Sequence, residues 1–369
     1  FYWDDWKDYL GVDDDRGLAK YMKTGSIMFM LNGEDHSKKS LKLFEEIGVD
    51  HEIWDLQKLK EKMPIYSHDW YDGTTRPDED DNFWDKSGKQ IEGAVWTPGS
   101  GYVSDPQLAS HNLQVATEAK GGEFLFDCEI NEIRQSNGKI EGVTLTSGEQ
   151  IDCKVVVNVA GPHSFVINRM AGVEDDMNIK TKALRHEVHH VPSPPGFDFE
   201  QNGVHTSDGD NAIYFRPEIG NSILIGSEDP ECDPKEWIEN PDEFNRNITE
   251  SQWKAQVYRC MRRIPDLEEP SRTKGVVDLY DVSDDWIPIY DSCSLKGYYM
   301  AIGSSGNQFK NAPIAGHCMA ELIDACEKGH DHDHDPVQVN TTYTGLTLNM
   351  GFYSRKREIN PNSSFSVNG

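Results

Sequence analysis

The sequence predicts an α/β protein with two domains, one of them of the α+β type, and three observations support this fold class. The chain has 369 residues, too many for one ordinary hydrophobic core, because single cores stop growing at roughly 250–300 residues. Two apolar runs, VVVNVA and YYMAI, are each followed by small residues and a helical pattern, as in a doubly wound sheet. Between these runs, residues 184–228 show the composition and alternation of β-strands.

The first quarter of the chain mixes short elements with a long polar segment. Residues 18–31 indicate a short helix that leads into a strand. Residues 36–55 predict an amphipathic helix that ends at Gly48. The turn-rich stretch 66–95 predicts a long surface excursion.

The pattern becomes more regular after residue 101. Ser104 is a candidate helix cap, Pro106 suits the first helical turn, and Gly121 ends that helix. Residues 123–135 then predict a strand, SNGK predicts a hairpin turn, and residues 140–148 predict the partner strand.

The middle of the chain contains a buried strand and a β-rich segment. Residues 154–162, KVVVNVAGP, form an apolar run without alternation, which indicates a strand buried on both faces. A helix follows over residues 163–173. Residues 183–192 and 211–230 predict strands, the latter as a hairpin around PEIGN.

The last third contains a helix, two strands and a polar end. Residues 247–267 predict a helix that is capped by Thr249 and closed by Pro265. Residues 274–291 predict a strand, and residues 297–326 predict a strand, a glycine-rich loop and a helix. The C-terminal stretch looks extended.

The charge of the chain excludes several function classes. The formal net charge is −28 at pH 7, so the surface repels nucleic-acid phosphates and anionic lipid head groups. We therefore expect neither a nucleic-acid nor a membrane partner, and no run of about 18 apolar residues occurs. The acidity favours solubility over an acidic docking face for a cationic partner.

The cysteines indicate the redox environment. They are odd in number and form no C-x-x-C pair, so the sequence indicates neither a disulfide framework nor a zinc site. A reducing cytoplasm fits this usage best. The seven are Cys128, Cys153, Cys232, Cys260, Cys293, Cys318 and Cys326.

The glycine-rich loop after YYMAI is the first candidate site. Gly303, Ser304, Ser305 and Gly306 precede a helix, whose free N–H groups stabilise an anion or a polar ring edge. Such a loop is also a common structural connector. The turn at Gly161 is of the same kind, and two such turns indicate a shared crevice at the carboxyl ends of the strands.

Five segments together resemble one family. GYVSDPQLASHNLQVATEAKGGEFLF, VVVNVAGPHS, YFRPEIGNSILIGSEDP, DLYDVSDDWIPIYD and GYYMAIGSSGNQFKNAPIAG occur in the order and spacing of the FAD-dependent superfamily of D-amino-acid oxidase, sarcosine oxidase and dimethylglycine dehydrogenase. The resemblance covers roughly residues 20–326. The family's motif G-F-S-G-H-G-F-K is similar to Gly303–Lys310 here.

The resemblance implies the cofactor and its contacts. Residues 303–310 are expected along the flavin of FAD, with Lys310 near a flavin carbonyl or the substrate carboxylate, where its charge stabilises the reduced flavin. Without the family, Lys310 is an ordinary lysine at a helix start. The implied cofactor-binding residues are Ile130, Ala160, Gly161, Gly303, Ser304, Ser305, Gly306, Asn307, Gln308, Phe309 and Lys310.

The resemblance also implies a substrate pocket, formed by Lys310, Tyr280, Arg216 and Tyr214. Alternation places Tyr214 and Arg216 on one side of a strand, where arginine can hold a carboxylate bidentately. The alternatives are a surface arginine, core tyrosines at 214 and 280, and a plain strand residue at Ile130.

The sequence departs from the family in two respects. The N-terminal strand with G-x-G-x-x-G that holds the FAD pyrophosphate is missing, and the pattern in TPGSGYVSDP follows a polar loop and does not replace it. The chain is therefore either part of a longer protein or a remnant that does not hold FAD alone. Asp278 stands where relatives carry a flavin-linked cysteine, so no thioether is expected there.

Metal and hydrolase sites are disfavoured. His186, His189 and His190 are separated by strand alternation, and the GHDHDHDP stretch lies in a polar loop, so adventitious binding outweighs a metal site. His163 and Ser164 lack an acidic partner, which disfavours a catalytic triad.

The expected function is flavin-dependent oxidation of a secondary or tertiary amine, such as an N-methyl amino acid, with oxygen or an electron-transfer protein as acceptor and a possible oligomer. The expected FAD domain comprises residues 101–183 and 270–330, the substrate domain 15–100 and 184–269, and the tail 331–369. The alternatives are an assembly subunit without catalysis, oxidation of a 2-hydroxy acid or polyol phosphate on the same fold, and a binding module for a cationic osmolyte.

Overall fold

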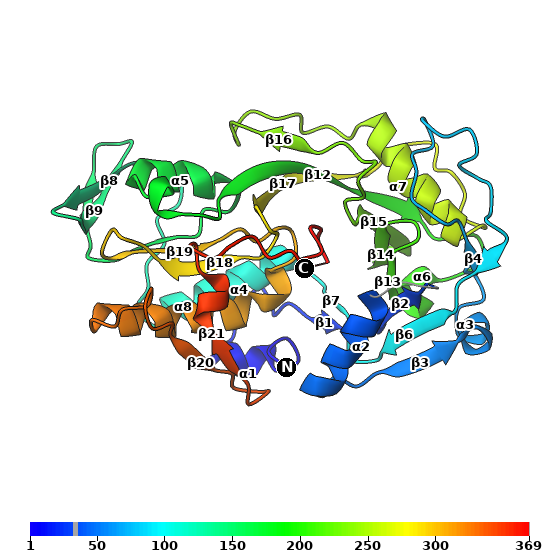
Figure 1. Ribbon diagram of the computed structural model, residues 1–369, viewed down its shortest axis with the longest axis horizontal. Helices are drawn as coiled ribbons and strands as arrows, with labels where there is room; N and C mark the ends of the chain where they lie inside the picture. The colour runs from blue at the N-terminus through cyan, green and yellow to red at the C-terminus, as the bar shows by residue number, and fades with distance from the viewer. Residues whose placement is uncertain (32–35, 369) are drawn as a thin grey trace. The chain divides into compact units, whose positions relative to one another are not determined.

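The computed structural model describes residues 1–31 and 36–368, without the side chain of His36 (Figure 1). The chain forms two compact units. Unit 1 comprises Phe1–Gly122, Glu187–Pro234 and Arg246–Asp278. Unit 2 comprises Glu123–His186, Lys235–Asn245 and Leu279–Gly369.

Unit 1 is built on a large, mostly antiparallel sheet. From the second half of β12 the order is β12-β15-β14-β13-β2-β6-β3, and only the β13–β2 pair is parallel. The hairpin predicted around PEIGN is confirmed, with Gly220 and Asn221 at positive φ. The strands are β2 (Ser26–Met30), β3 (Glu52–Asp55), β6 (Gly93–Thr97), β12 (Thr181–Pro192), β13 (His205–Asp208), β14 (Ile213–Glu218) and β15 (Ser222–Ser227).

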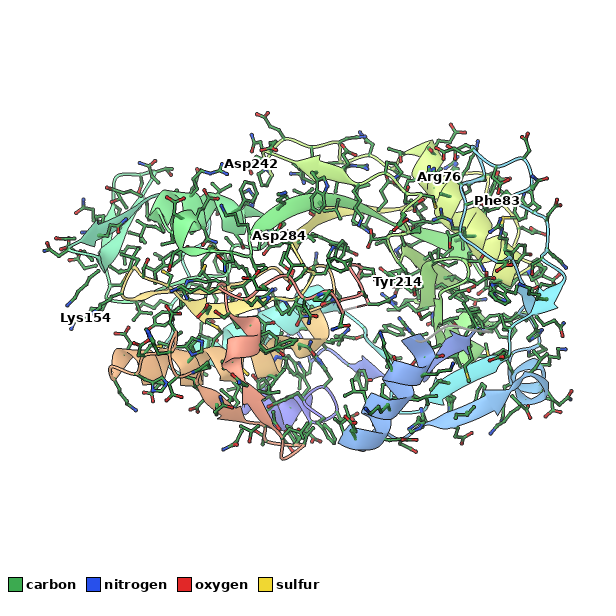
Figure 2. All side chains as sticks on the ribbon, in the orientation of Figure 1. Arg76, Phe83, Lys154, Tyr214, Asp242 and Asp284 are labelled. Carbon is green, nitrogen blue, oxygen red and sulfur yellow. The ribbon has the colours of Figure 1, made fainter. Side chains whose placement is uncertain are left out.

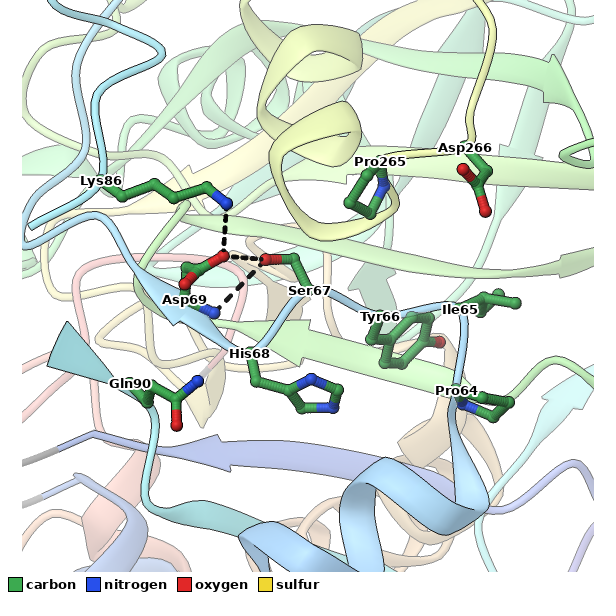
Figure 3. A pocket seen from close by; sticks show the side chains of 10 residues that line it. All are labelled: Pro64, Ile65, Tyr66, Ser67, His68, Asp69, Lys86, Gln90, Pro265 and Asp266. Atoms are coloured by element: carbon green, nitrogen blue, oxygen red, sulfur yellow. Dashed lines mark hydrogen bonds and ion pairs between the residues drawn. The ribbon is translucent and has the colours of Figure 1, made fainter. Parts of the chain in front are cut away.

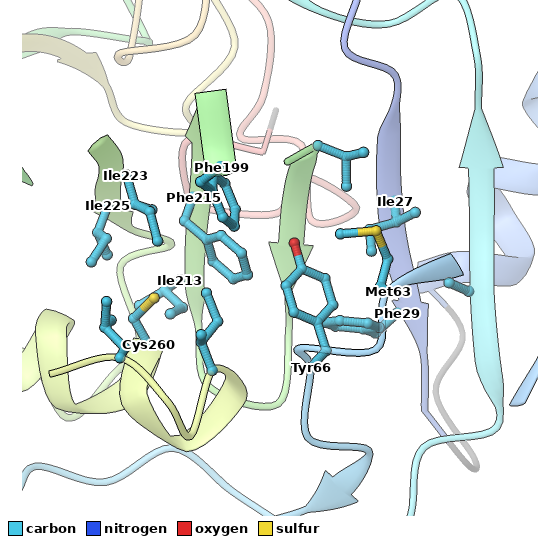
Figure 4. Close-up of a cluster of buried hydrophobic side chains, with 14 of the residues drawn as sticks. Ile27, Phe29, Met63, Tyr66, Phe199, Ile213, Phe215, Ile223, Ile225 and Cys260 are labelled. Carbon is cyan, nitrogen blue, oxygen red and sulfur yellow. The ribbon is translucent and has the colours of Figure 1, made fainter. Parts of the chain in front are cut away.

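The core of unit 1 lies between this sheet and helix α7 (Glu250–Arg263). Phe215 and Ile225 from the sheet and Cys260 from the helix belong to one buried cluster, and Figure 4 shows Cys260 on the helix beside the strand residues. Each fully buried side chain of this size contributes about 1.5–3 kcal/mol. The helix predicted over residues 247–267 is confirmed as α7, and its apolar face packs against the sheet.

Other helices and short strands of unit 1 lie mainly in its N-terminal part. α2 is confirmed and ends at Gly48, which has φ 72°. The helix expected at the start of residues 18–31 is wrong, because Tyr21–Met22 forms strand β1 and pairs with β7. The elements are α1 (Trp6–Leu10), β1 (Tyr21–Met22), α2 (His36–Ile47), α3 (Leu56–Lys62), β7 (Tyr102–Val103), α4 (Pro106–Glu118) and α6 (Phe199–Asn202).

The cap of α4 differs from the prediction. Asp105 accepts a hydrogen bond from the Leu108 N–H at 2.9 Å and occupies the cap position. The Ser104 hydroxyl instead accepts from the Lys20 N–H at 3.1 Å. The start of the helix was therefore predicted correctly at Pro106, but the capping residue was not.

The segment 66–95, predicted as a long surface excursion, contains side chains that are buried against the rest of unit 1. It contains β4 (Asp69–Trp70), β5 (Lys89–Gln90) and the start of β6. Arg76 is buried and donates to Asp233 at 2.9 Å and to Ser251 at 2.6 Å, and Arg262 of α7 lies over the ring of buried Phe83. Figure 2 labels Arg76 and Phe83 beside α7. The expectation of a surface loop is wrong at Arg76 and Phe83, because buried arginines link both positions to α7.

Unit 2 contains two three-stranded sheets, β10-β9-β8 and β11-β19-β18, and a two-stranded sheet near its C-terminus, while β16 pairs with the first half of β12. β11 and β19 are parallel, and the β8–β9 hairpin turns at Asn137 and Gly138, both at positive φ, as SNGK predicts. The strands are β8 (Ile130–Ser136), β9 (Lys139–Leu145), β10 (Gln150–Asp152), β11 (Val156–Asn158), β16 (Glu236–Ile238), β17 (Gly275–Ser283, shared with unit 1), β18 (Ile289–Ser292) and β19 (Tyr298–Ile302).

Helices α5 (Ser164–Ala171) and α8 (Ala312–Glu327) follow β11 and β19, as the sequence predicted. One cluster of buried side chains joins Met300 of β19 to Ala171 of α5, and a second joins Tyr299 to Leu322 of α8. The single strand expected over residues 274–291 is two strands, because a turn at Trp286, with φ 61°, separates β17 from β18.

Two predictions for unit 2 are wrong in the same way. Residues 123–129 are irregular, and Phe124, Leu125 and Phe126 are 42%, 59% and 65% exposed. Strand β11 is at the edge of its sheet, so Val157 and Val159 are 36% and 66% exposed although burial on both faces was expected. In the described residues, neither segment has the second partner strand that its apolar composition suits.

The C-terminal tail is more ordered than expected. β20 (Gln338–Asn340) pairs with β21 (Thr347–Asn349). Beyond this hairpin, buried Arg355 forms ion pairs with Asp176, Asp291 and Asp333 at 2.7, 3.0 and 2.9 Å.

Within residues 1–31 and 36–368, no helix combines the length and the apolar composition that crossing a membrane requires.

Candidate functional site

The candidate site begins at the carboxyl end of β19, where the chain turns before α8. Gly303, Ser305 and Gly306 have φ of 70°, 49° and 76°, so three residues of this short turn are left-handed. A Cβ atom at Gly306 would overlap the ring of Tyr280. Glycine is required there because the Tyr280 ring lies directly against the backbone.

Asp281 holds this turn in place. Its carboxylate accepts a hydrogen bond from the Gly303 N–H at 2.6 Å, and its backbone carbonyl accepts from the Ser305 N–H at 2.7 Å. The side chain is 2% exposed, and burial raises its pKa to about 6. The hydrogen bond from the Gly303 N–H offsets part of that shift.

A cavity of about 460 Å³ adjoins Asp281. It lies at the carboxyl ends of the parallel strands β11 and β19, and small residues from both following turns and from α8 line it. These small residues are Gly161, Ser304, Ala312, Ala315 and Gly316. The predicted crevice between the two small-residue turns is therefore present in unit 2.

The turn after β11 is shaped by buried Asn158. Its Nδ2 donates to the Ser164 carbonyl and to Asn168 Oδ1, both at 2.9 Å, and its Oδ1 accepts from the Ala160 N–H at 3.1 Å. Ala160 is exposed, and Gly161 follows with φ 57°. Ala160 and Gly161 were predicted from the sequence and Asn158 was not, although its polar character inside an apolar strand was the available signal.

The second half of the glycine-rich loop contains a buried polar side chain, Asn307. Asn307 is 8% exposed, and its Nδ2 is buried with no hydrogen-bond partner in the described part of the chain. Its Oδ1 accepts from the Gln308 side chain, whose Oε1 accepts from Tyr290 at 3.2 Å and from Asn311 at 2.9 Å. A buried donor of this kind costs about 1–3 kcal/mol unless a ligand or water pairs with it.

Lys310 and Phe309 follow at the start of α8. Phe309 is 44% exposed, and Lys310 also retains an exposed surface. Desolvation by surrounding atoms nevertheless lowers the pKa of Lys310 below its ordinary value of 10.5. The loop therefore ends in a partly desolvated cation.

Ile130 and Tyr280 complete the predicted residues of unit 2. Ile130 is half-buried at the start of β8, opposite Leu145. Tyr280 on β17 stacks on His186 with ring centroids 4.3 Å apart, in addition to its contact with Gly306. The structure thus brings Tyr280 to the glycine-rich turn and places Ile130 on the separate β8–β9 hairpin.

Tyr214 and Arg216 lie on the same side of β14 in unit 1, as alternation predicts. The Tyr214 ring lies over Gly226 of β15, where a Cβ atom would overlap it. Arg216 pairs with Glu218 at 3.0 Å and lies over the Tyr102 ring at 4.3 Å. The Arg216 guanidinium therefore already has a carboxylate partner, Glu218.

Two of the buried histidines lie near carboxylates. His189 is buried 3.8 Å from Glu187, and His332 lies 3.4 Å from Asp291. In the part of the chain that the structure describes, no three His, Cys, Asp or Glu side chains are grouped as metal ligands.

A smaller polar cavity of about 310 Å³ lies in unit 1 (Figure 3). Lys86 pairs with Asp69 at 2.7 Å across one side of it, and Ser67 donates to the same carboxylate at 2.9 Å. Burial lowers the pKa of His68 to about 4, so its imidazole is neutral near pH 7. None of the sequence-predicted site residues lines this cavity.

Comparison with known proteins agrees with the predicted resemblance. The pattern of the family described as FAD dependent oxidoreductase (DAO) matches residues 3–322. Glycine oxidase from Geobacillus kaustophilus is 23% identical over 244 residues, 65% of this chain and 58% of that protein. Sarcosine oxidase subunit beta from Rhizobium meliloti is 24% identical over 206 residues, 56% of this chain and 45% of that subunit. The chain thus spans about half the length of these relatives.

Solved structures show the same fold. L-proline dehydrogenase from P. horikoshii matches with a TM-score of 0.68 at 18% identity, over 96% of this chain and 79% of that one. The predicted mixed α/β fold is therefore confirmed.

Proposed function

The chain belongs to the FAD-dependent oxidoreductase family, and on this basis we propose that it oxidises the C–H bond next to nitrogen in a secondary or tertiary amine. The proposed substrate class is an N-methyl amino acid of the sarcosine or dimethylglycine type. The names of two relatives, glycine oxidase and sarcosine oxidase subunit beta, support amine substrates. The substrate would lose a hydride from carbon, and water would hydrolyse the resulting imine.

The observation that carries this proposal is the buried, unpartnered Nδ2 of Asn307 in the left-handed turn at residues 303–306. A flat ring with carbonyl oxygens at its edge fits a turn whose glycines leave room for close approach. The small residues around the 460 Å³ cavity, including Gly161 and Gly316, suit the same ligand. The residues present therefore fit the FAD of the family, which supplies the hydride acceptor when bound.

The roles of the chain's own side chains follow from their chemistry. Lys310 would stabilise negative charge at the ring edge, and Tyr280 would form an aromatic wall beside Gly306. Arg216 would hold the substrate carboxylate, with Tyr214 next to it on β14. We assign the FAD domain to residues 101–183 and 270–330, the substrate domain to 15–100 and 184–269, and the tail to 331–369.

An assembly subunit is the second candidate function. The exposed run Phe124–Phe126 and the open edge of β11 favour a partner chain, and one relative is named as a subunit.

If the protein is instead an active enzyme, oxygen or an electron-transfer protein would reoxidise its flavin.

The test is an absorption spectrum of the full-length protein, followed by anaerobic mixing with candidate substrates. Flavin absorption that bleaches with sarcosine or dimethylglycine, but not with lactate or glycerol 3-phosphate, is the expected result. Bleaching by the hydroxy compounds alone would overturn the amine assignment. If the protein shows no flavin absorption even after incubation with FAD, the amine-oxidation proposal is wrong and the assembly subunit remains as the candidate function.

A further inference from the structure

A second and larger cavity of about 820 Å³ lies in unit 2, at the amino ends of β11 and β19. The cavity near Asp281 lies at the carboxyl ends of the same two parallel strands, so the two are separate sites. The larger cavity is lined by three lysines, Lys139, Lys154 and Lys296. All three lysines are exposed, and Figure 2 labels Lys154.

The backbone brings the three lysines together from three connections. Lys139 and Lys296 are partners in a parallel bridge, and the Lys296 N–H donates to the Gly138 carbonyl at 3.0 Å. A Cβ atom at Gly297 would overlap the Lys154 carbonyl oxygen. Glycine at position 297 therefore permits the close approach of the chain at Lys154 to the β18–β19 turn.

Three carboxylates also line this cavity, and each has a partner other than the three lysines. Glu327 accepts a hydrogen bond from the Tyr299 hydroxyl at 2.8 Å, and Asp331 pairs with His334 at 3.0 Å. Asp333 pairs with two basic side chains of the tail, at 2.9 and 2.7 Å. No ion pair to the ammonium groups of Lys139, Lys154 or Lys296 is found among residues 1–31 and 36–368.

Three neighbouring lysines without an ion-pair partner among the described residues are unexpected in so acidic a chain. Acidic residues outnumber basic ones 64 to 36, so carboxylates are abundant as partners. Like charges on directly paired residues destabilise a sheet. A bound anion would remove that repulsion.

We propose that this cavity binds an anion of the diphosphate type. Lysine ammonium groups act as separate point charges, which suit a compact anion with charge on several oxygens, whereas a single carboxylate suits the planar fork of arginine. The volume of about 820 Å³ also admits a nucleoside attached to the diphosphate.

Isothermal titration of the full-length, FAD-loaded protein with sodium pyrophosphate tests the proposal. The triple variant K139Q/K154Q/K296Q should bind at least tenfold more weakly, whereas K120Q, at an exposed lysine of unit 1, should bind as the wild type does. Affinity should fall as salt is added. Titration with adenosine diphosphate distinguishes a nucleotide ligand, which binds more tightly than pyrophosphate, from an inorganic one.

The control for folding is thermal unfolding without added anion. The triple variant should unfold at the same temperature as the wild type or higher, because repulsion among the lysines is removed. Absence of pyrophosphate binding by the wild type, or undiminished binding by a triple variant that retains its flavin spectrum, would overturn the proposal. Either result leaves the amine-oxidation proposal untouched, because the flavin is measured separately.

Discussion

At the scale of single residues, Asp281 links the glycine-rich turn to the rest of unit 2. Its side chain is almost completely buried, and the folded protein raises its pKa from 3.8 to about 6. A raised carboxyl pKa means that the folded state binds the proton more tightly than the unfolded state does. Its contribution to stability is therefore greatest below pH 3.8 and is lost as the pH rises through about 6.

Asp281→Asn tests this linkage. In the variant, the amide oxygen can still accept from the Gly303 N–H, but the side chain no longer titrates. Between pH 3.8 and 6, the free energy of unfolding of the variant should therefore fall less than that of the wild type. The difference is on the order of 3 kcal/mol. Urea unfolding at a series of pH values measures it, and Asp266→Asn, at an exposed carboxyl, is the control. Equal pH dependence in wild type and D281N would contradict the assigned pKa.

Gly306 gives a second prediction at this scale. Gly306→Ala should destabilise the protein by more than the roughly 1–2 kcal/mol that a left-handed alanine costs, because the added Cβ meets the Tyr280 ring. Gly345→Ala is the matched control, since Gly345 has a similar φ of 68° and open space around its Cβ position. Thermal unfolding and FAD affinity are the two measurements. If both variants behave alike, the contact with Tyr280 is not what requires glycine.

At the scale of elements, a network of buried charges joins the segment 66–95 to α7. Asp233 receives hydrogen bonds from Arg76 at 2.9 Å and from Arg259 at 2.7 Å, and both arginines are nearly inaccessible to water. These pairs lower the pKa of Asp233 although burial alone would raise it. The network explains how a polar segment remains attached to an apolar core.

Asp233→Asn should lower the free energy of unfolding by about 3–5 kcal/mol, because two buried guanidinium groups lose their counter-charge. Lys58→Met, which breaks an exposed pair with Glu52, should change it by less than about 1 kcal/mol. Chemical denaturation of both variants provides the comparison. A small effect of D233N would indicate that water reaches the two arginines.

The elements also show which predictions local sequence can support. The β14–β15 hairpin and α7 were predictable, because turn residues and apolar periodicity act within a few residues. Residues 123–129 and the outer face of β11 were not, because a strand's burial depends on partners elsewhere in the chain. The same limit applies to the site: the glycines of 303–306 stand out in the sequence, but nothing local marks Asp281 as their anchor.

At the scale of the whole molecule, the net charge of −28 sets a general property. Repulsion among the surface carboxylates opposes the compact state, and salt screens it. The midpoint of thermal unfolding should therefore rise between low salt and about 1 M sodium chloride, where the Debye length is about 3 Å. A non-electrolyte at equal osmolarity is the control, and a midpoint that falls with salt would show that specific ion pairs outweigh the general repulsion.

The open edge of β11 has a consequence for hydrogen exchange. The Val156 N–H donates to the Gly297 carbonyl at 2.8 Å, so alternation directs the N–H of Val157 away from β19. In a β11 without a second neighbour, the Val157 amide exchanges with solvent deuterium rapidly while the Val156 amide is protected. Slow exchange at both amides would instead report that another strand, from whatever source, occupies that edge, so two adjacent amides can reveal the assembly state of the protein.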